Sequence, residues 1–384
     1  MHVVGGLYRE LCSVPDWSAV FGSGGRAAAA VSVLSPGSTL HTYAEDCFSE
    51  GVTSLKKLGI QIRISPRPTD IVFAYFHSLS RPYIQPPVDE IKRLPPIHVS
   101  GDAVLRFGFL EGDAVIDARR AVYDPQTWQN PALFGANGSV AKELAIVLNE
   151  LELRSATRLD NLSSAASYLM KHQGATVIVA KGGARGATVF KRDGQAVHVP
   201  AYRSSRVFKI GTGDVFSAIF AHCWAEKGLP VLEAADVASR SVAVYCSAGR
   251  LPLADDALRH QIPLQCLAPG RVALEGSANT IGRRYMMEEA RFVLRELGVE
   301  VFCPALDGTF GSTVTAVLVL ADGLGKVAAE QVQSAKATGV PIVVLCEDGV
   351  QAMSALIGVA GITVTDDFAS ALYFVAWAAA EHAV

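Results

Sequence analysis

Short apolar runs that favour β-strands alternate with helical segments along almost the whole chain of 384 residues. Two of these runs are Val-Ile-Val-Ala-Lys at 177–181 and Ala-Val-Leu-Val-Leu at 316–320, and each leads into a turn that contains glycine. Apolar runs of this kind, separated by periodic helices, are typical of parallel sheets that are covered on both faces. The sequence therefore predicts an α/β fold.

The alternation is interrupted once, at residues 251–270, which contain three prolines and have no clear period. A chain of this length also exceeds the usual size of one domain. We therefore expect a large domain at 1–262, a linker at 263–270 and a compact domain at 271–384. The second of these domains has a usual size for an independent folding unit.

Composition narrows the class of protein. Half of the residues are apolar, 18% are charged and the net charge is -3, which indicates folded domains with sizeable cores and argues against a nucleic-acid partner. The seven cysteines are widely spaced and form no Cys-x-x-Cys pair, so we expect neither a disulfide framework nor a zinc site. No signal peptide is apparent, and the apolar run at 371–380 is too short to span a bilayer. We expect a cytoplasmic protein without a membrane segment.

The stretch Gly-Thr-Gly-Asp at 211–214 opens a segment whose apolar residues have helical spacing. Gly211 and Gly213 leave the backbone N–H groups accessible, and the N-terminus of a helix attracts anions. A carboxylate at Asp214 could therefore accept a proton from a hydroxyl that attacks a phosphoryl group. An ordinary glycine-rich turn followed by a helix with an N-capping aspartate could have the same sequence. This stretch alone leaves both interpretations open.

Six further segments, taken in order along the chain, resemble the signatures of the ribokinase-like (PfkB) family of sugar and nucleoside kinases. They are the first strand at 3–10, the Gly-Gly-rich segment at 21–34, the segment at 44–62, the strand ending in Asp at 121–126, the Asn-x-x-Glu pattern at 148–152 and the Gly-x-x-Gly strand turn at 177–190. The resemblance covers the whole N-terminal domain. It implies a three-layer α/β/α kinase domain, with a reduced β lid because the domain is short for the family.

The resemblance also implies roles for individual residues. Asp214 would be the catalytic base, and Gly211, Thr212 and Gly213 would form the anion hole for the transferred phosphoryl group. Mg²⁺ would have no direct protein ligand and would be organised through water, since it keeps much of its hydration. The residues implied beside ATP and Mg²⁺ are Asn149, Glu152, Lys181, Gly183 and Gly186. Those implied on the substrate side are Glu10, Gly22, Gly24, Gly25, Arg26 and Asp46.

Three places are compared as departures from the family pattern. Glu10 stands where the family usually has an acid, five residues past the glycine of the first strand, that binds sugar hydroxyls. Arg26 stands where the family usually has Asn, and it is either a ligand for a substrate that carries an anion or a solvated loop residue. Phe208, Lys209 and Ile210 replace the usual Asp-Thr-Thr. Lys209 would then supply the charge of a monovalent cation, or face solvent.

The segment 271–384 resembles nucleoside 2-deoxyribosyltransferases and their N-glycoside-hydrolysing relatives in the order of its strands and helices. This resemblance implies a small flavodoxin-like parallel sheet. Gly276 and Ser277 would form a turn that can hold phosphate, Asp322 would end the third strand, and Glu330 would be the candidate nucleophile. Asp322 and Glu330 also suit a turn residue and a solvated helix position.

The sequence as a whole predicts an ATP- and Mg²⁺-dependent kinase that acts on a hydroxyl of a small-molecule sugar or nucleoside, fused to a domain that binds a nucleoside or nucleotide. Two alternatives remain. The protein could be a catalytically reduced, nucleotide-binding regulatory protein, or a bifunctional kinase with N-glycosidase or deoxyribosyltransferase activity at Glu330. We also expect a homo-oligomer.

Overall fold

The computed structural model describes residues 1–45, 50–127, 131–265, 270–307, 313–324, 326–337, 339–347 and 359–383. The chain divides into two compact units, one formed by 1–204 with 209–262 and the other by 205–208 with 263–384. Asp46, which was predicted on the substrate side, lies outside the described residues, as do residues 266–269 of the predicted linker. Each unit is built on its own sheet, so each is described separately.

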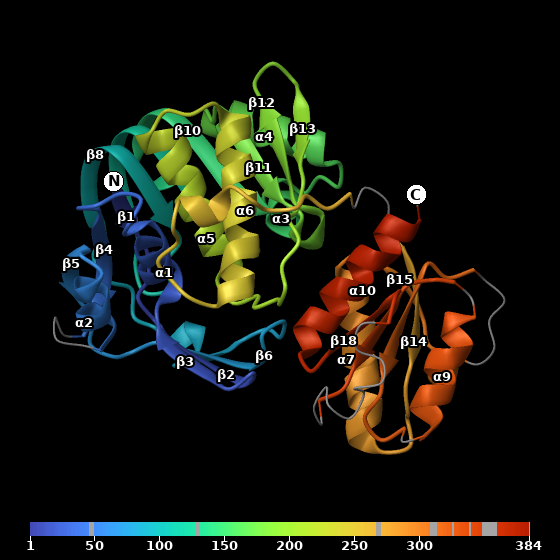
Figure 1. Ribbon diagram of the computed structural model, residues 1–384. Helices are drawn as coiled ribbons and strands as arrows, with labels where there is room; N and C mark the ends of the chain where they lie inside the picture. Colours follow the sequence, from blue (N-terminus) through green and yellow to red (C-terminus); the bar gives the residue numbers. More distant parts are fainter. Residues whose placement is uncertain are drawn as a thin grey trace. The chain divides into compact units, whose positions relative to one another are not determined.

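Nine of the described strands form the large sheet of the first unit (Figure 1). In spatial order they are β13 (Ala196–Val199), β12 (Ala187–Lys191), β11 (Val177–Lys181), β10 (Val140–Asn149), β9 (Ala114–Asp124), β8 (Ile97–Phe107), β1 (His2–Val4), β4 (Thr39–Ala44) and β5 (Gln61–Pro66). Neighbouring strands from β11 to β5 are parallel, whereas β12 and β13 are antiparallel. Residues 144–148 of β10 are all buried, as expected for a parallel strand with both faces covered.

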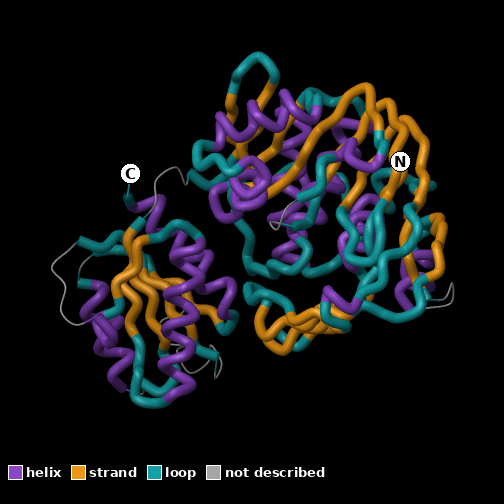
Figure 2. Tube along the Cα trace, turned by 180° about the vertical axis from the view of Figure 1, so that it is seen from behind, coloured by secondary structure: helices purple, strands orange, loops and turns teal. Residues whose placement is uncertain are grey.

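Helices cover both faces of this sheet (Figures 1 and 2). On one face, α1 (Gly22–Val31), α5 (Thr212–Ala221) and α6 (Val231–Ala248) pack side by side. On the other, α3 (Glu150–Thr157) and α4 (Leu162–Gln173) bury Leu153 and Leu169 in the main apolar core. Helix α2 (Glu50–Lys57) packs against α1. Single helical turns lie at Val88–Glu90, Phe134–Asn137, Gly183–Arg185 and Asp256–Leu258, and a π-turn lies at His222–Glu226.

A second, smaller sheet belongs to the first unit (Figure 1). Its described strands, in spatial order, are β3 (Trp17–Val20), β2 (Arg9–Val14), β6 (Val72–His77) and β7 (Tyr83–Gln85). Strand β2 pairs antiparallel with β3 and parallel with β6. These strands carry Glu10 and Tyr75, which reach the candidate site described below.

The second unit contains a parallel sheet whose described strands, in spatial order, are β15 (Glu300–Phe302), β14 (Arg271–Glu275), β16 (Ala316–Leu320), β17 (Ile342–Leu345) and β18 (Ile362–Thr365). Its described helices are α7 (Ile281–Glu296), α8 (Pro304–Asp307), α9 (Lys326–Lys336) and α10 (Phe368–His382). The predicted fold class is therefore confirmed, since an α/β domain with a large, mostly parallel sheet accompanies a further parallel sheet. None of the described helices is long and apolar enough to cross a membrane.

His41 is a buried histidine on β4 whose Nε2 lies 3.0 Å from Nδ1 of His2. Burial, with His2 and Arg63 nearby, lowers the pKa of His41 from 6.5 to about 4. His41 therefore becomes protonated near pH 6.5 in the unfolded chain, but only near pH 4 in the folded chain. This difference lowers the free energy of unfolding as the pH falls from 6.5 toward 4. We expect His41→Asn to weaken that fall, as measured by urea unfolding at pH 7 and pH 5.

The exposed His98 on β8 provides the control for this experiment. In His98→Asn, the free energy of unfolding should change between pH 7 and pH 5 by the same amount as in the wild-type protein. If the His41 variant also showed the wild-type change in the free energy of unfolding between pH 7 and pH 5, the assignment of this pH dependence to His41 would be contradicted.

Candidate active site

Asp214 lies in the first turn of α5 and is only 7% exposed. The helix begins directly after Gly211, whose φ of 76° is a left-handed conformation that glycine adopts without strain. Burial raises the pKa of Asp214 to about 6, with Arg26 opposing the shift and Glu10 adding to it. A buried carboxylate with a pKa near neutrality is suited to accepting a proton from a substrate.

Arg26 lies against this carboxylate from the side of α1. Its Nη1 donates to Oδ2 of Asp214 over 3.1 Å and to Oε1 of Glu10 over 3.0 Å, and its Nη2 donates to Oε2 of Glu10. Its Nε donates to the hydroxyl of Tyr245 over 3.2 Å. Arg26 is completely buried, so its interpretation as a solvated loop residue is wrong. The structure places its charge between two carboxylates.

The predicted glycines of the substrate side lie at the start of α1, where they make close contacts within the chain itself. The N–H of Gly24 donates to the carbonyl of Gly6 over 3.0 Å. A Cβ atom at Gly24 would lie 2.4 Å from the carbonyl oxygen of Gly5, and one at Gly25 would lie 2.8 Å from Leu7. Gly22 has a φ of 59°. These glycines let α1 approach β1 closely, which brings Arg26 to Asp214.

Two lysine side chains flank the turn that leads into α5. Nζ of Lys209 donates to Oγ1 of Thr212 over 2.9 Å. A Cβ atom at Gly213 would lie 3.3 Å from Nζ of Lys181, which places that ammonium group beside the turn on another side. Burial lowers the pKa of Lys209. Burial would lower the pKa of Lys181 too, but the carboxylates of Asp124 and Glu152 raise it.

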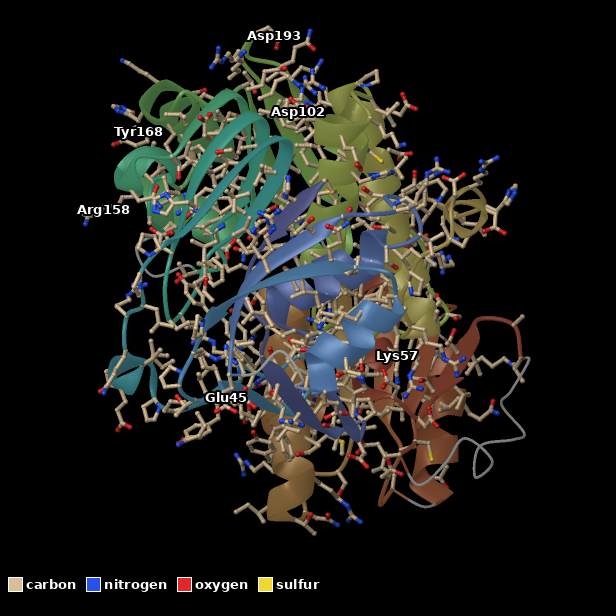
Figure 3. All side chains as sticks on the ribbon, turned by 90° about the vertical axis from the view of Figure 1, so that its left-hand side faces the viewer. Glu45, Lys57, Asp102, Arg158, Tyr168 and Asp193 are labelled. Atoms are coloured by element: carbon tan, nitrogen blue, oxygen red, sulfur yellow. The ribbon has the colours of Figure 1, made fainter. Side chains whose placement is uncertain are left out.

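The carboxyl edge of the large sheet brings three polar residues together, because Asp124, Asn149 and Lys181 end the neighbouring parallel strands β9, β10 and β11. Nζ of Lys181 and Oγ of Ser217 each lie 2.7 Å from Oδ2 of Asp124. Figure 3 shows Glu45, which directly follows β4, well away from Asp102 and Asp193. Because β4 is parallel to its neighbours, Glu45 follows the carboxyl end of a strand of the same sheet.

The predicted pair Asn149 and Glu152 forms a capping box at the start of α3. Oδ1 of Asn149 accepts from the N–H of Glu152 over 2.8 Å, and Oε2 of Glu152 accepts from the N–H of Asn149 over 2.7 Å. Burial and the nearby carboxylate of Asp124 raise the pKa of Glu152 to about 7. Gly183 and Gly186 lie in the turn after β11 and have φ values of 61° and 89°.

Asp124 and Tyr245 have contacts that sequence reasoning did not assign. In the sequence analysis Asp124 was named only as the end of a strand. In the structure it is completely buried and accepts a hydrogen bond from Nζ of Lys181. The carboxyl ends of adjacent parallel strands share one edge, and this rule could have joined Asp124 to Asn149 and Lys181. Tyr245 lies on α6 without any local motif, so no pattern pointed to it.

In the second unit, Gly276 and Ser277 follow β14, and Asp322 follows the neighbouring strand β16 by two residues. Oδ2 of Asp322 accepts from the N–H of Glu347 over 2.8 Å. Glu330, the candidate nucleophile, is exposed on α9. The structure thus brings the turn residues to one sheet edge and leaves Glu330 on a solvent-facing helix position.

Comparison with known proteins finds one family model that matches part of the first unit. The family model described as "pfkB family carbohydrate kinase" matches residues 122–250, a range that contains Asp124, Asn149, Lys181 and Asp214. A search of curated protein sequences finds no match.

Solved structures with a similar fold include two ribokinases. The ribokinase of Thermotoga maritima is 16% identical, with a TM-score of 0.50, and the match covers 67% of this chain and 97% of that one. The ribokinase of Arabidopsis thaliana, complexed with ribose and ATP, is 14% identical, with a TM-score of 0.51, over 67% of this chain and 98% of that one. At these identities the likeness concerns the fold. Residues 122–250 therefore match the pfkB family carbohydrate kinase model, and the first unit has a ribokinase-like fold.

Proposed function

We propose that this protein transfers a phosphoryl group from ATP to a hydroxyl group of a sugar or nucleoside. The observation that carries the proposal is the position of Asp214, a buried carboxylate in the first turn of α5, directly after the Gly211–Gly213 turn and beside the ammonium groups of Lys181 and Lys209. A base next to an anion site is what phosphoryl transfer to a hydroxyl requires. The carbohydrate kinase family match supports a sugar as acceptor.

The reaction would proceed at the start of α5. The acceptor hydroxyl gives its proton to Asp214 while its oxygen bonds to the γ-phosphorus and the bond to the leaving ADP oxygen breaks. The N–H groups of the first helical turn have no partner inside the helix, so those of Gly213 and Asp214 are suited to the charge that develops on the phosphoryl oxygens. The N–H of Thr212 contributes less, because it already donates to the carbonyl of Lys209 over 3.3 Å.

The residues at the carboxyl edge fit a bound Mg²⁺. Glu152 is a buried carboxylate whose pKa is raised to about 7 by burial and by the like charge of Asp124, and a cation nearby would relieve that repulsion. Asn149 and Glu152 would hold the ion through water. When bound, the ion supplies charge neutralisation to the donor phosphates.

The nucleotide would lie beside Lys181, Gly183 and Gly186, at the end of β11. Glycines in left-handed conformations allow backbone N–H groups to approach phosphates closely. The Arabidopsis ribokinase of similar fold is complexed with ATP, which supports ATP as the donor.

We also propose that the second unit binds a nucleoside or nucleotide. The support is its parallel sheet, in which the turn at Gly276–Ser277 and the nearby Asp322 follow adjacent strands. Ligands of open parallel sheets bind outside the carboxyl ends of such strands. Calorimetric titration of the whole protein with nucleosides is expected to show binding that weakens in Asp322→Asn and persists in Asp214→Asn. Binding that depends on Asp214 instead would contradict the assignment to the second unit.

The kinase proposal is tested by ADP release from Mg²⁺ and ATP across a panel of sugars and nucleosides. We expect release that depends on one class of acceptor, stops when EDTA removes Mg²⁺ and returns when Mg²⁺ is added back. Binding of ATP is measured in the same preparation by calorimetry. Clear binding of ATP without ADP release on any acceptor would contradict the kinase proposal and favour a nucleotide-binding regulatory protein.

A further inference from the structure

We infer that Arg26 is the positioning residue of Asp214, with Glu10 as its support: the guanidinium holds Oδ2 of the carboxylate, so that Oδ1 is the oxygen that meets the acceptor hydroxyl. The inference rests on the proposed kinase reaction and adds to it the way in which the base is oriented. It assigns Glu10 to Arg26 and away from direct contact with the acceptor.

The contacts of Arg26 leave its guanidinium little freedom. All three of its nitrogens donate hydrogen bonds, to Asp214, to both carboxylate oxygens of Glu10 and to the hydroxyl of Tyr245. The rings of Trp17 and Phe21 lie 6.0 and 5.4 Å from its Cζ atom. A buried arginine that is held in this way cannot turn without breaking several charge-assisted bonds at once.

The same arginine also touches the turn that precedes the base. The hydroxyl of Tyr245 accepts from Nε of Arg26 and donates to the carbonyl of Ile210 over 3.1 Å. A Cβ atom at Gly211 would lie only 2.0 Å from Nε of Arg26. Arg26 therefore fixes Asp214 relative to the turn, which sets the distance between the base and the anion site.

In this inference, Glu10 acts on the acceptor through Arg26, because each of its carboxylate oxygens accepts a hydrogen bond from the guanidinium. The carboxylate lies on β2 and is 5% exposed. If the lone pairs that accept from Arg26 also accepted from sugar hydroxyls, the hydrogen bonds between Glu10 and Arg26 would weaken. The side chain of Asp214 keeps 10% of its own surface exposed, compared with 6% for the side chain of Glu10.

Charged and titratable groups face Asp214 from every element around it. From β2, α1, β6 and α6 these are Glu10, Arg26, Tyr75 and Tyr245. From β9, α3, β11 and the turn they are Asp124, Glu152, Lys181 and Lys209. Within the first set, Arg26 lowers the pKa of Asp214 whereas Glu10 raises it. Neutralising the two residues one at a time should therefore move the pKa of Asp214 in opposite directions.

The test compares Arg26→Gln with Glu10→Gln. A neighbouring opposite charge lowers a carboxyl pKa by about 1 to 3 units. We therefore expect the acidic limb of kcat/KM against pH to move up by about one unit in the Arg26 variant and to move down in the Glu10 variant. In both variants we expect kcat to fall more than KM changes. Arg119→Gln, on an exposed arginine of β9, is the control and should leave the limb in place.

Arg26→Lys separates charge from geometry. Lysine keeps the positive charge but lacks the planar fork of donors, so the limb should return toward its wild-type position while kcat stays low. If the limb stays in place in both the Arg26→Gln and Glu10→Gln variants while kcat falls, the role of Arg26 is merely structural and the inference is overturned. If Arg26→Gln does not fold, the Glu10→Gln and Arg26→Lys variants still decide the outcome.

A second readout separates this inference from the kinase proposal. Carbon-13 NMR of protein labelled at aspartate follows the titration of Asp214 directly, with the resonance assigned by its loss in Asp214→Asn. The same opposite shifts in a protein without turnover would support the role of Arg26 and count against the kinase. Turnover in the wild-type protein, with no shift of the Asp214 resonance titration in either variant, would support the kinase proposal and count against the role of Arg26.

Discussion

Asp214→Asn is expected to lower turnover by about 10²- to 10⁴-fold, the range that removal of a general base produces. Asn has nearly the same shape and keeps an oxygen that can accept from Nη1 of Arg26, so the buried contact at 3.1 Å can persist. What it loses is the capacity to take the proton of the acceptor hydroxyl. ADP release at saturating sugar, together with calorimetric binding of ATP, measures the two effects separately.

Glu233→Gln provides the matched control, because Glu233 also lies in the first turn of a helix, α6, but is exposed. We expect its turnover to equal that of the wild-type protein. Equal turnover in the Asp214 variant would rule out Asp214 as the base and leave it as a structural partner of Arg26. The alternative of an N-capping aspartate is wrong, because the N-cap of α5 is Gly211 and no side chain caps the helix.

Gly211→Ala is expected to destabilise the first unit by about 2–5 kcal/mol, which combines about 1–2 kcal/mol for a left-handed alanine with about 1–3 kcal/mol for overpacking. The φ of Gly211 is 76°, and the added methyl group would lie 2.0 Å from Nε of Arg26 and 2.3 Å from its Cζ. Arg26 would have to move, which would break its contacts with Asp214 and Tyr245. We therefore expect turnover to fall as well.

Gly174→Ala isolates the backbone contribution. Gly174 ends α4 with a φ of 67°, and a Cβ atom there would have nothing within 4 Å. Its substitution should cost only the strain of about 1–2 kcal/mol and leave turnover unchanged. Urea unfolding of both variants gives the comparison. Equal losses of stability would show that the contact between Gly211 and Arg26 has no energetic weight.

Patterns along the chain predicted much of the architecture. The apolar runs at 177–181 and 316–320 are strands β11 and β16, in which residues 177–180 and 316–320 are buried. They could be predicted because a strand that is covered on both faces is almost entirely apolar. The glycines at 211–213 predicted the turn before a helix, since backbone requirements of this kind are local. Sequence order alone also placed Asp214 in the first turn of α5.

The partners of Asp214 were decided by the tertiary structure. Arg26 is 188 residues away from Asp214 and 219 residues away from Tyr245 along the chain, and no periodicity relates such positions. The burial of Arg26, and with it the choice between a substrate ligand and a partner for internal carboxylates, depends on how α1, β2 and α6 pack around it. A sequence determines local conformation and the sides that must be buried, whereas the pairing of distant charges emerges only when the packed elements exclude water and require each charge to find a partner.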